Sequence, residues 1–132
     1  MALSIKTLLP DGEINLELLK VLADNSFDSI LVTDATKDGK IMYANAAFKK
    51  LTGFSQEEVV GQTPRILQGP ATDKKVIDKL RKVLSSGGKF EDRAINYKKN
   101  GTPFIMHWKV LPIKHKGAIK AWIAIQRETS GL

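Results

Sequence analysis

The chain of 132 residues contains no cysteine. This absence excludes disulfides, thiolate metal sites, thiol nucleophiles and any cysteinyl adduct. The chain also lacks an apolar run long enough to cross a bilayer. Its first residues lack the basic and apolar blocks of a signal peptide. We therefore expect a cytoplasmic protein with no membrane partner.

Several motifs of catalysis and cofactor binding are missing as well. The chain has neither a glycine-rich dinucleotide fingerprint nor a Walker loop, and no Ser-His-Asp set is indicated by spacing. The two histidines, His107 and His115, have no acidic or thiol ligands near them in sequence, and residues 72–86 offer no histidine for a haem iron. We expect no metal site.

The charge balance is basic, with a formal net charge of +7. Clustered positive charge would suggest nucleic acid as a partner, but here the Lys and Arg residues are scattered over expected loops and polar helix faces. A solvated surface explains them better, so we expect no nucleic-acid partner. A length of 132 residues with 42% hydrophobic residues suits one domain with a real core.

The first half of the chain predicts short elements. A Pro10-Asp11-Gly12 turn precedes an amphipathic helix that ends at Asn25-Ser26. Strands are expected at 29–35 and 40–43, joined by a hairpin turn. Short helices are expected at 45–51, after the capping box that begins at Ser55, and at Pro64 with Thr63 as its N-cap. The longest helix is expected to begin at the cap Thr72 and to end at Gly87-Gly88.

The second half predicts three long strands, 90–99, 102–114 and 118–127, joined by turns at Asn100-Gly101 and Lys116-Gly117. Alternation divides their side chains between two faces. The expected inner face holds Ala94, Asn96, Phe104, Met106, Trp108, Val110, Trp122, Ala124 and Gln126. The expected outer face holds Ile95, Tyr97, Ile105, His107, Ile123 and Ile125. That apolar outer face needs a cover, either a second copy or the N-terminal helix.

Two amides on an otherwise apolar inner face need hydrogen-bond partners. An unpaired buried amide costs about 1 to 3 kcal/mol. The edge of a bound ring would satisfy Asn96 and Gln126, and so would neighbouring backbone, each other's side chain or a water. The residues alone leave these alternatives open.

Three segments, "ILVTDA", "YANAAFKKLTGFSQEEVVGQ" and "GTPFIMHWKVLPI", resemble a PAS domain. Further segments, "RILQGPATD", "NYKKNG" and "IAIQRE", resemble the LOV (light-oxygen-voltage) flavin-binding branch of that superfamily. The resemblance covers about residues 25–130 and implies an α+β fold: a five-stranded antiparallel sheet with short helices and one longer helix packed on one face. Residues 1–24 would form a flanking helical segment. Such domains are sensors and as a rule not enzymes.

The resemblance also implies FMN as cofactor and names its contacts. The LOV turn reads Gly-x-Asn-Cys-Arg-Phe-Leu-Gln-Gly, and "GQTPRILQG" follows it with Pro64 in place of the adduct-forming cysteine. Guanidinium forks suit a phosphate monoester, so two arginines on facing helices would hold it from two directions. The implied cofactor-binding residues are Thr63, Arg65, Gln68, Arg81, Asn96, Met106 and Gln126.

Thr63 and Met106 replace asparagines of the LOV pattern, and each replacement removes polar capacity. Losing one or two hydrogen bonds of this kind costs about 1 to 3 kcal/mol. Our hypothesis is a sensor that binds FMN noncovalently and relays its light or redox state through Gln126, with nearby indoles able to quench the flavin. The alternative is a cofactor-free dimerisation and signal-relay module whose core is filled by Met106, Trp108 and Trp122. A different small ligand is a third reading. We expect a homodimer through the outer sheet face, within a longer protein that carries an output domain.

Overall fold

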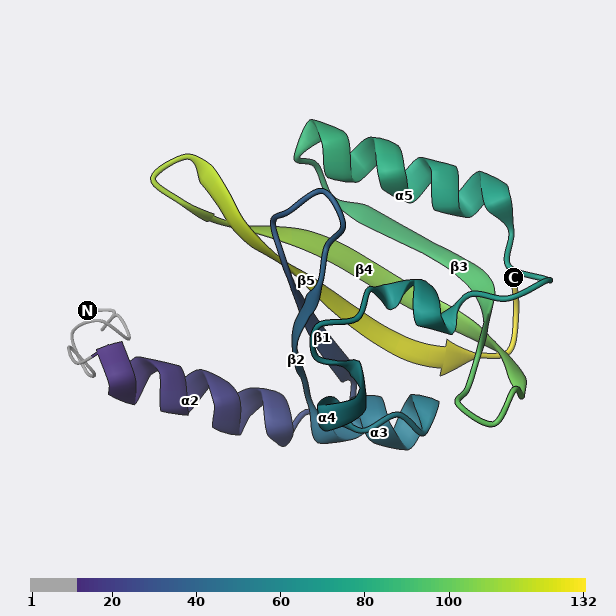
Figure 1. The fold of residues 1–132 in the computed structure, drawn as a ribbon, viewed down its shortest axis with the longest axis horizontal. Helices are drawn as coiled ribbons and strands as arrows, with labels where there is room; N and C mark the ends of the chain where they lie inside the picture. The colour runs from purple at the N-terminus through teal and green to yellow at the C-terminus, as the bar shows by residue number, and fades with distance from the viewer. Residues whose placement is uncertain (1–11) are drawn as a thin grey trace.

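The computed structural model describes residues 12–132, and its centre is one five-stranded antiparallel sheet (Figure 1). The strands lie in the order β2-β1-β5-β4-β3. Their bounds are β1 (Ser29–Asp34), β2 (Ile41–Ala44), β3 (Phe90–Tyr97), β4 (Pro103–His115) and β5 (Ala118–Thr129). All five predicted strands are confirmed, and so is the α+β fold class. The predicted Pro10-Asp11 turn lies outside the described residues.

The turn residues that predicted the hairpins adopt the backbone that those turns require. Lys116 and Gly117 both have positive φ, 51° and 80°, as a two-residue turn between twisted strands demands. In the β1–β2 turn, the carboxylate of Asp34 accepts hydrogen bonds from Thr36 N and Lys40 N, both at 3.1 Å. The long β4–β5 hairpin thereby places Gln126 directly opposite Trp108.

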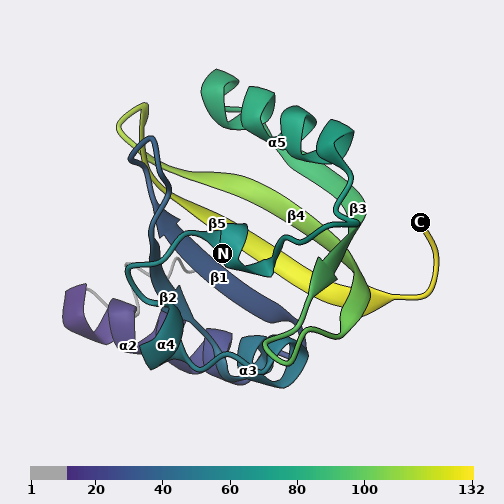
Figure 2. The same cartoon turned by 45° about the vertical axis from the view of Figure 1, so that its right-hand side comes forward.

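Four helices follow β2 and lie on one side of the sheet (Figure 2). They are α3 (Ala46–Thr52), α4 (Gln56–Val59), the 3₁₀ helix η1 (Pro64–Leu67) and α5 (Lys74–Ser86). The predicted capping box at Ser55 is confirmed, with Glu58 N donating to Ser55 Oγ at 3.2 Å and Ser55 N to Glu58 Oε1 at 3.0 Å. Pro64 opens η1 after Thr63 as predicted, although the Thr63 side chain makes no cap hydrogen bond.

The predicted cap of the longest helix is wrong by one residue. Asp73 caps α5, accepting from Lys75 N at 2.8 Å. Thr72 instead joins the preceding loop to the sheet: its hydroxyl accepts from Gly69 N at 3.0 Å and donates to Ile95 O at 2.6 Å. Two adjacent residues with short polar side chains compete for the cap, and the strand contact decides between them.

The core lies between the inner face of the sheet and these helices. Phe48 of α3, Val59 of α4 and Leu67 of η1 pack there against strand residues. The buried strand residues of this cluster are Leu31, Ile41, Ala44, Phe90, Ala94, Phe104, Met106, Trp108, Val110 and Trp122. The alternation that predicted the inner face is confirmed.

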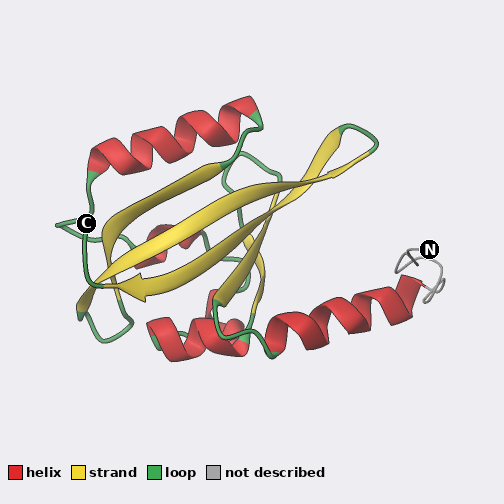
Figure 3. Ribbon diagram, turned by 180° about the vertical axis from the view of Figure 1, so that it is seen from behind, coloured by secondary structure: helices red, strands yellow, loops and turns green. Residues whose placement is uncertain are grey.

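The flanking helix α2 (Gly12–Asp24) projects away from the sheet (Figure 1). It is fixed at its end by the buried side chain of Asn45, whose Nδ2 donates to Ala23 O at 2.6 Å and to Asp28 O at 3.0 Å. Seen from behind, no described helix lies across the outer face of the sheet (Figure 3). The expectation that the N-terminal helix covers this face is therefore wrong for the described residues. No helix among residues 12–132 combines the length and apolar character of a membrane span.

Candidate functional site

Three neighbouring strands bring the predicted ring-edge residues together on the inner face. Asn96 lies on β3, Met106 on β4 and Gln126 on β5, and their exposed fractions are 5%, 1% and 4%. Because Met106 pairs with Ala94, it is the diagonal neighbour of Asn96. Asn96 Nδ2 lies 3.3 Å from Met106 Sδ, a weak acceptor.

The carbonyl oxygen of Asn96 has no partner. Among the buried side-chain nitrogen and oxygen atoms of the described residues, Asn96 Oδ1 is the only one without a hydrogen bond. Leaving a buried acceptor unpaired costs about 1 to 3 kcal/mol, so native proteins rarely keep one without a reason. A ligand that presents an N–H group beside an acceptor would satisfy both ends of this amide.

Gln126 has a partner that the sequence did not point to. Its Oε1 accepts a hydrogen bond from Ser29 Oγ at 3.0 Å, and both residues are buried. The two residues are direct partners in the antiparallel β1–β5 ladder. The sequence shows only that Ser29 begins a β-rich segment. The pairing of β1 with β5 is needed to place Ser29 opposite Gln126.

The turn that carries the LOV motif is held close to β3. Gly69 lies so near Tyr97 that an added Cβ would fall 2.3 Å from Tyr97 Cε2. The Tyr97 hydroxyl accepts a hydrogen bond from Ala71 N at 2.9 Å. Tyr97, expected on the open outer face, thus packs against this loop. Glycine is required at position 69 because the aromatic ring occupies the space of a side chain.

Three of the predicted cofactor residues belong to this turn. Arg65 is exposed, and its Nε donates to Thr63 Oγ1 at 3.2 Å. Gln68 follows η1 and is half-buried, with its backbone N–H donating to Arg65 O at 3.0 Å. Thr63 therefore orients Arg65 while leaving the guanidinium NH2 groups available.

Arg81, on α5, makes no hydrogen bond to these residues in the described part of the chain. Its side chain is 72% exposed and pairs with Asp78 of the same helix at 3.2 Å. Within residues 12–132 no hydrogen bond joins Arg81 to η1. The two-sided phosphate clamp stays a prediction, since both guanidinium groups would have to turn toward the ligand.

Two indoles complete the inner face. Trp108 and Trp122 are 6% and 8% exposed, and the Trp108 ring packs on Phe90 with 5.1 Å between centroids. Met106, Trp108 and Trp122 all belong to the packed inner face, as the alternative of a filled core requires.

A cleft of about 270 Å³ lies at the Gln126 end of the site, and its lining includes Gln126, Ser29 and the exposed Phe27. Lys98 also lines this cleft. Its Nζ donates to Leu51 O at 2.8 Å, pairs with Glu128 at 3.2 Å and lies 4.9 Å from the Phe104 ring centroid. Lys98 thus joins the end of α3 to β5 two residues beyond Gln126. Sequence reasoning missed it because the contact spans distant segments.

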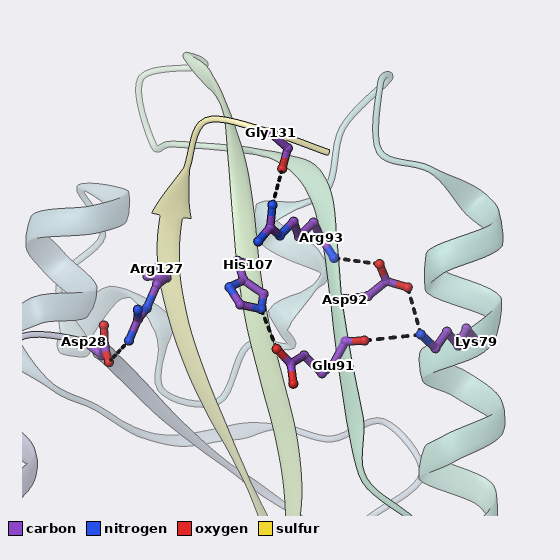
Figure 4. Close-up of polar contacts among 8 residues, drawn as sticks. All are labelled: Asp28, Lys79, Glu91, Asp92, Arg93, His107, Arg127 and Gly131. Carbon is purple, nitrogen blue, oxygen red and sulfur yellow. Dashed lines mark hydrogen bonds and ion pairs between the residues drawn. The ribbon is translucent and has the colours of Figure 1, made fainter.

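Hydrogen bonds among ionisable side chains cover part of the outer face (Figure 4). His107 Nε2 lies 2.7 Å from Glu91 Oε2, and Arg127 pairs with Asp28 at 2.7 Å. The hydrogen bond from His107 lowers the pKa of the Glu91 carboxyl. His107 lies on the outer face, as predicted. Among the described residues no cluster of side chains is suited to hold a metal ion.

The chain is similar in sequence to known proteins. The model of the PAS domain family matches residues 28–130. Phototropin-1A of Oryza sativa subsp. japonica is 43% identical over 104 residues, which is 77% of this chain but 11% of that protein. A blue-light-activated histidine kinase of Brucella anthropi is 34% identical over 94 residues, 70% of this chain and 19% of the kinase. The chain thus spans only a small part of the length of these two relatives.

The fold is also similar to solved structures of LOV domains. A structure described as a flavin-analogue study of light-oxygen-voltage domain mechanism has a TM-score of 0.80 and 30% identity, covering 90% of this chain and 89% of that one. The LOV domain of the Erythrobacter litoralis EL346 blue-light-activated histidine kinase has a TM-score of 0.75 and 28% identity, covering 79% of this chain and 97% of that one.

Proposed function

The chain belongs to the PAS domain family, in its LOV branch, and from this premise we propose that it binds FMN noncovalently and relays a light or redox signal without a cysteinyl adduct. As part of a longer protein it would act on an attached output domain. FMN, when bound, supplies blue-light absorption and one-electron redox chemistry. The proposal is carried by the unpaired Asn96 Oδ1 on the inner face.

The amide of Asn96 fits the group that the family implies. The pyrimidine edge of an isoalloxazine ring presents an N–H donor between two carbonyl acceptors. Asn96 offers an unpaired acceptor, and its Nδ2 donor is engaged only by a thioether. Hydrogen bonds from the ring edge to Oδ1 and from Nδ2 to the ring edge would recover the free energy that burial of the amide costs. Arg65 and Arg81 would turn from solvent to hold the phosphate.

The relay would begin at Gln126 and reach the flanking helix through two steps. Ser29 Oγ donates to Gln126 Oε1, and a hydroxyl can accept as well as donate. Rotation of the Gln126 amide by half a turn would present Nε2 to Ser29 and reverse this hydrogen bond. Asn45 then joins β1 to α2, since its Oδ1 accepts from Ile30 N at 2.8 Å while its Nδ2 donates to Ala23 O.

The visible spectrum of the purified protein tests the proposal. We expect addition of FMN to give a bound, structured flavin band, and Gln126→Leu to shift that band to the blue because the ring loses a polar contact. Gln62→Leu, at an exposed glutamine, is the matched control and should leave the band unchanged. Protein that stays colourless after FMN is added rejects the proposal, and an unshifted Gln126→Leu band removes Gln126 from the ring.

A cofactor-free dimerisation and signal-relay module is the second candidate. It is favoured by the packed inner face with Met106, Trp108 and Trp122, and by the exposure of Arg65 and Arg81. The outer sheet face, which no described helix covers, would form the dimer interface. Protein that binds no FMN yet dimerises with rising concentration in sedimentation experiments would establish this function instead.

A further inference from the structure

We propose that Trp108 is the internal electron donor for a flavin held at the inner face, and this inference rests on the proposed FMN binding. The chain has no cysteine, so a thiol cannot react with the excited ring. When an electron leaves before a proton does, a neutral indole is easier to oxidise than a neutral phenol. The candidate donors of the chain are its two tryptophans and two tyrosines.

Strand register places Trp108 beside Gln126, the residue proposed to contact the flavin ring. Trp108 of β4 is the direct partner of Gln126 of β5. Direct partners in an antiparallel pair have Cα atoms roughly 4.5 to 5.5 Å apart and side chains on the same face. A ring that contacts the Gln126 amide therefore also lies next to the Trp108 indole.

The other tryptophan is placed differently. Trp122 pairs with Pro112 on one side and with Thr33 on the other. It lies four positions before Gln126 on the same strand, which corresponds to about 13 Å along β5 at the usual rise of a strand. It is nevertheless buried to almost the same extent as Trp108, 8% against 6% exposed. It is thus a matched control within the same sheet face.

The tyrosines are engaged elsewhere. Tyr97 packs its ring against Gly69 and accepts a hydrogen bond from Ala71 N. The Tyr43 hydroxyl donates to Asp24 at the end of α2. Desolvation and this carboxylate raise the pKa of Tyr43, whose hydroxyl thus contacts the flanking helix and not the Gln126 end of the sheet. Neither phenol is adjacent to Gln126 in the ladder, which leaves Trp108.

The step is a one-electron transfer. The Trp108 indole would give one electron to the light-excited ring of bound FMN, and the oxidised indole would release its ring N–H proton to water. Water would supply the proton that accompanies this electron. Unless the electron returns directly, an external thiol reductant restores the indole. In each cycle the reductant is oxidised and the flavin is reduced, while Trp108 is unchanged.

The test uses the whole chain reconstituted with FMN, as wild type, Trp108→Phe and Trp122→Phe. FMN binding is first measured by absorbance titration. The fluorescence lifetime of bound FMN and the anaerobic rate of photoreduction in the presence of dithiothreitol are then compared. We expect Trp108→Phe to lengthen the lifetime several-fold and to abolish most of the photoreduction, and Trp122→Phe to change both less.

The outcomes separate the two proposals. A wild-type protein that binds no FMN overturns both. Bound FMN whose lifetime is unchanged in Trp108→Phe, or changed more in Trp122→Phe, overturns the assignment of Trp108 and leaves FMN binding standing. Should Trp108→Phe fail to fold, Trp108→Tyr keeps a polar ring in place. It should lengthen the lifetime, because a protonated phenol gives up an electron less readily than a neutral indole, and an unchanged lifetime counts against Trp108.

Discussion

Replacing Asn96 by leucine should stabilise the flavin-free protein and weaken FMN binding at the same time. The side chain is 5% exposed, its Oδ1 has no partner and its Nδ2 meets only Met106 Sδ. Leucine has a similar size and leaves no buried polar atom. Removing an unpaired acceptor should raise the free energy of unfolding of the flavin-free protein by about 1 to 3 kcal/mol.

The effect on binding has the opposite sign. Losing the amide contacts to the ring edge should weaken FMN affinity by about one to two decades. At an FMN concentration about 100 times the wild-type Kd, binding adds about 2.7 kcal/mol to wild-type stability. A variant with roughly thirtyfold weaker affinity gains only about 0.9 kcal/mol at that concentration. The stability advantage of the variant should therefore shrink by about 2 kcal/mol when FMN is added.

Urea unfolding with and without FMN measures both effects, and Asn45→Leu is the control. Asn45 is also buried, with 3% of its surface exposed, but its amide makes four hydrogen bonds: with Ile30 N, Phe48 N, Ala23 O and Asp28 O. Its replacement should therefore lower stability, by roughly 2 kcal/mol or more, with and without FMN. An Asn96→Leu protein that is less stable than wild type without FMN would refute the reasoning, because Asn96 would then have a partner in the folded chain.

Two further predictions concern the scaffold around the site. Gly69→Ala should destabilise the protein by about 1 to 3 kcal/mol in urea unfolding, because its Cβ would meet the Tyr97 ring at 2.3 Å. Gly88→Ala, whose Cβ would have its nearest contact at 3.5 Å, should change the stability little. Equal losses of stability in the two variants would contradict the contact between Gly69 and Tyr97. The hydrogen bond from Lys99, with that from Ser55 N, lowers the pKa of Glu58 from 4.5 to about 2. Wild type should therefore be more stable than Glu58→Gln above pH 4.5, and the difference should vanish as the pH falls toward 2; a difference that persists at low pH would contradict the ion pair.

Local sequence signals predicted the elements well because their physical causes are local. Asn100-Gly101 and Lys116-Gly117 supply the backbone of tight hairpins, and the Ser55 capping box fixes the start of α4. Alternation of apolar residues assigned the inner face of the three long strands, including Met106 and Gln126. Each of these signals spans only a few residues.

The site could be predicted only in part because its contacts join distant segments. Ser29 reaches Gln126 across 97 residues, and Tyr97 reaches the turn at Gly69 across 28. The exposed position of Arg81 depends on how α5 lies against the sheet. Thr72 was assigned as a cap because sequence could not show that Ile95 O lies within reach of its hydroxyl. None of these contacts leaves a periodic trace in the sequence.

Native mass spectrometry of the chain incubated with FMN tests the central claim most directly. We predict a complex heavier than the chain by one FMN, which loses the whole flavin on denaturation in the dark or after illumination, because no thiol is present to bond it. A chain that keeps its own mass at every FMN concentration would contradict the account, and so would a flavin that survives denaturation.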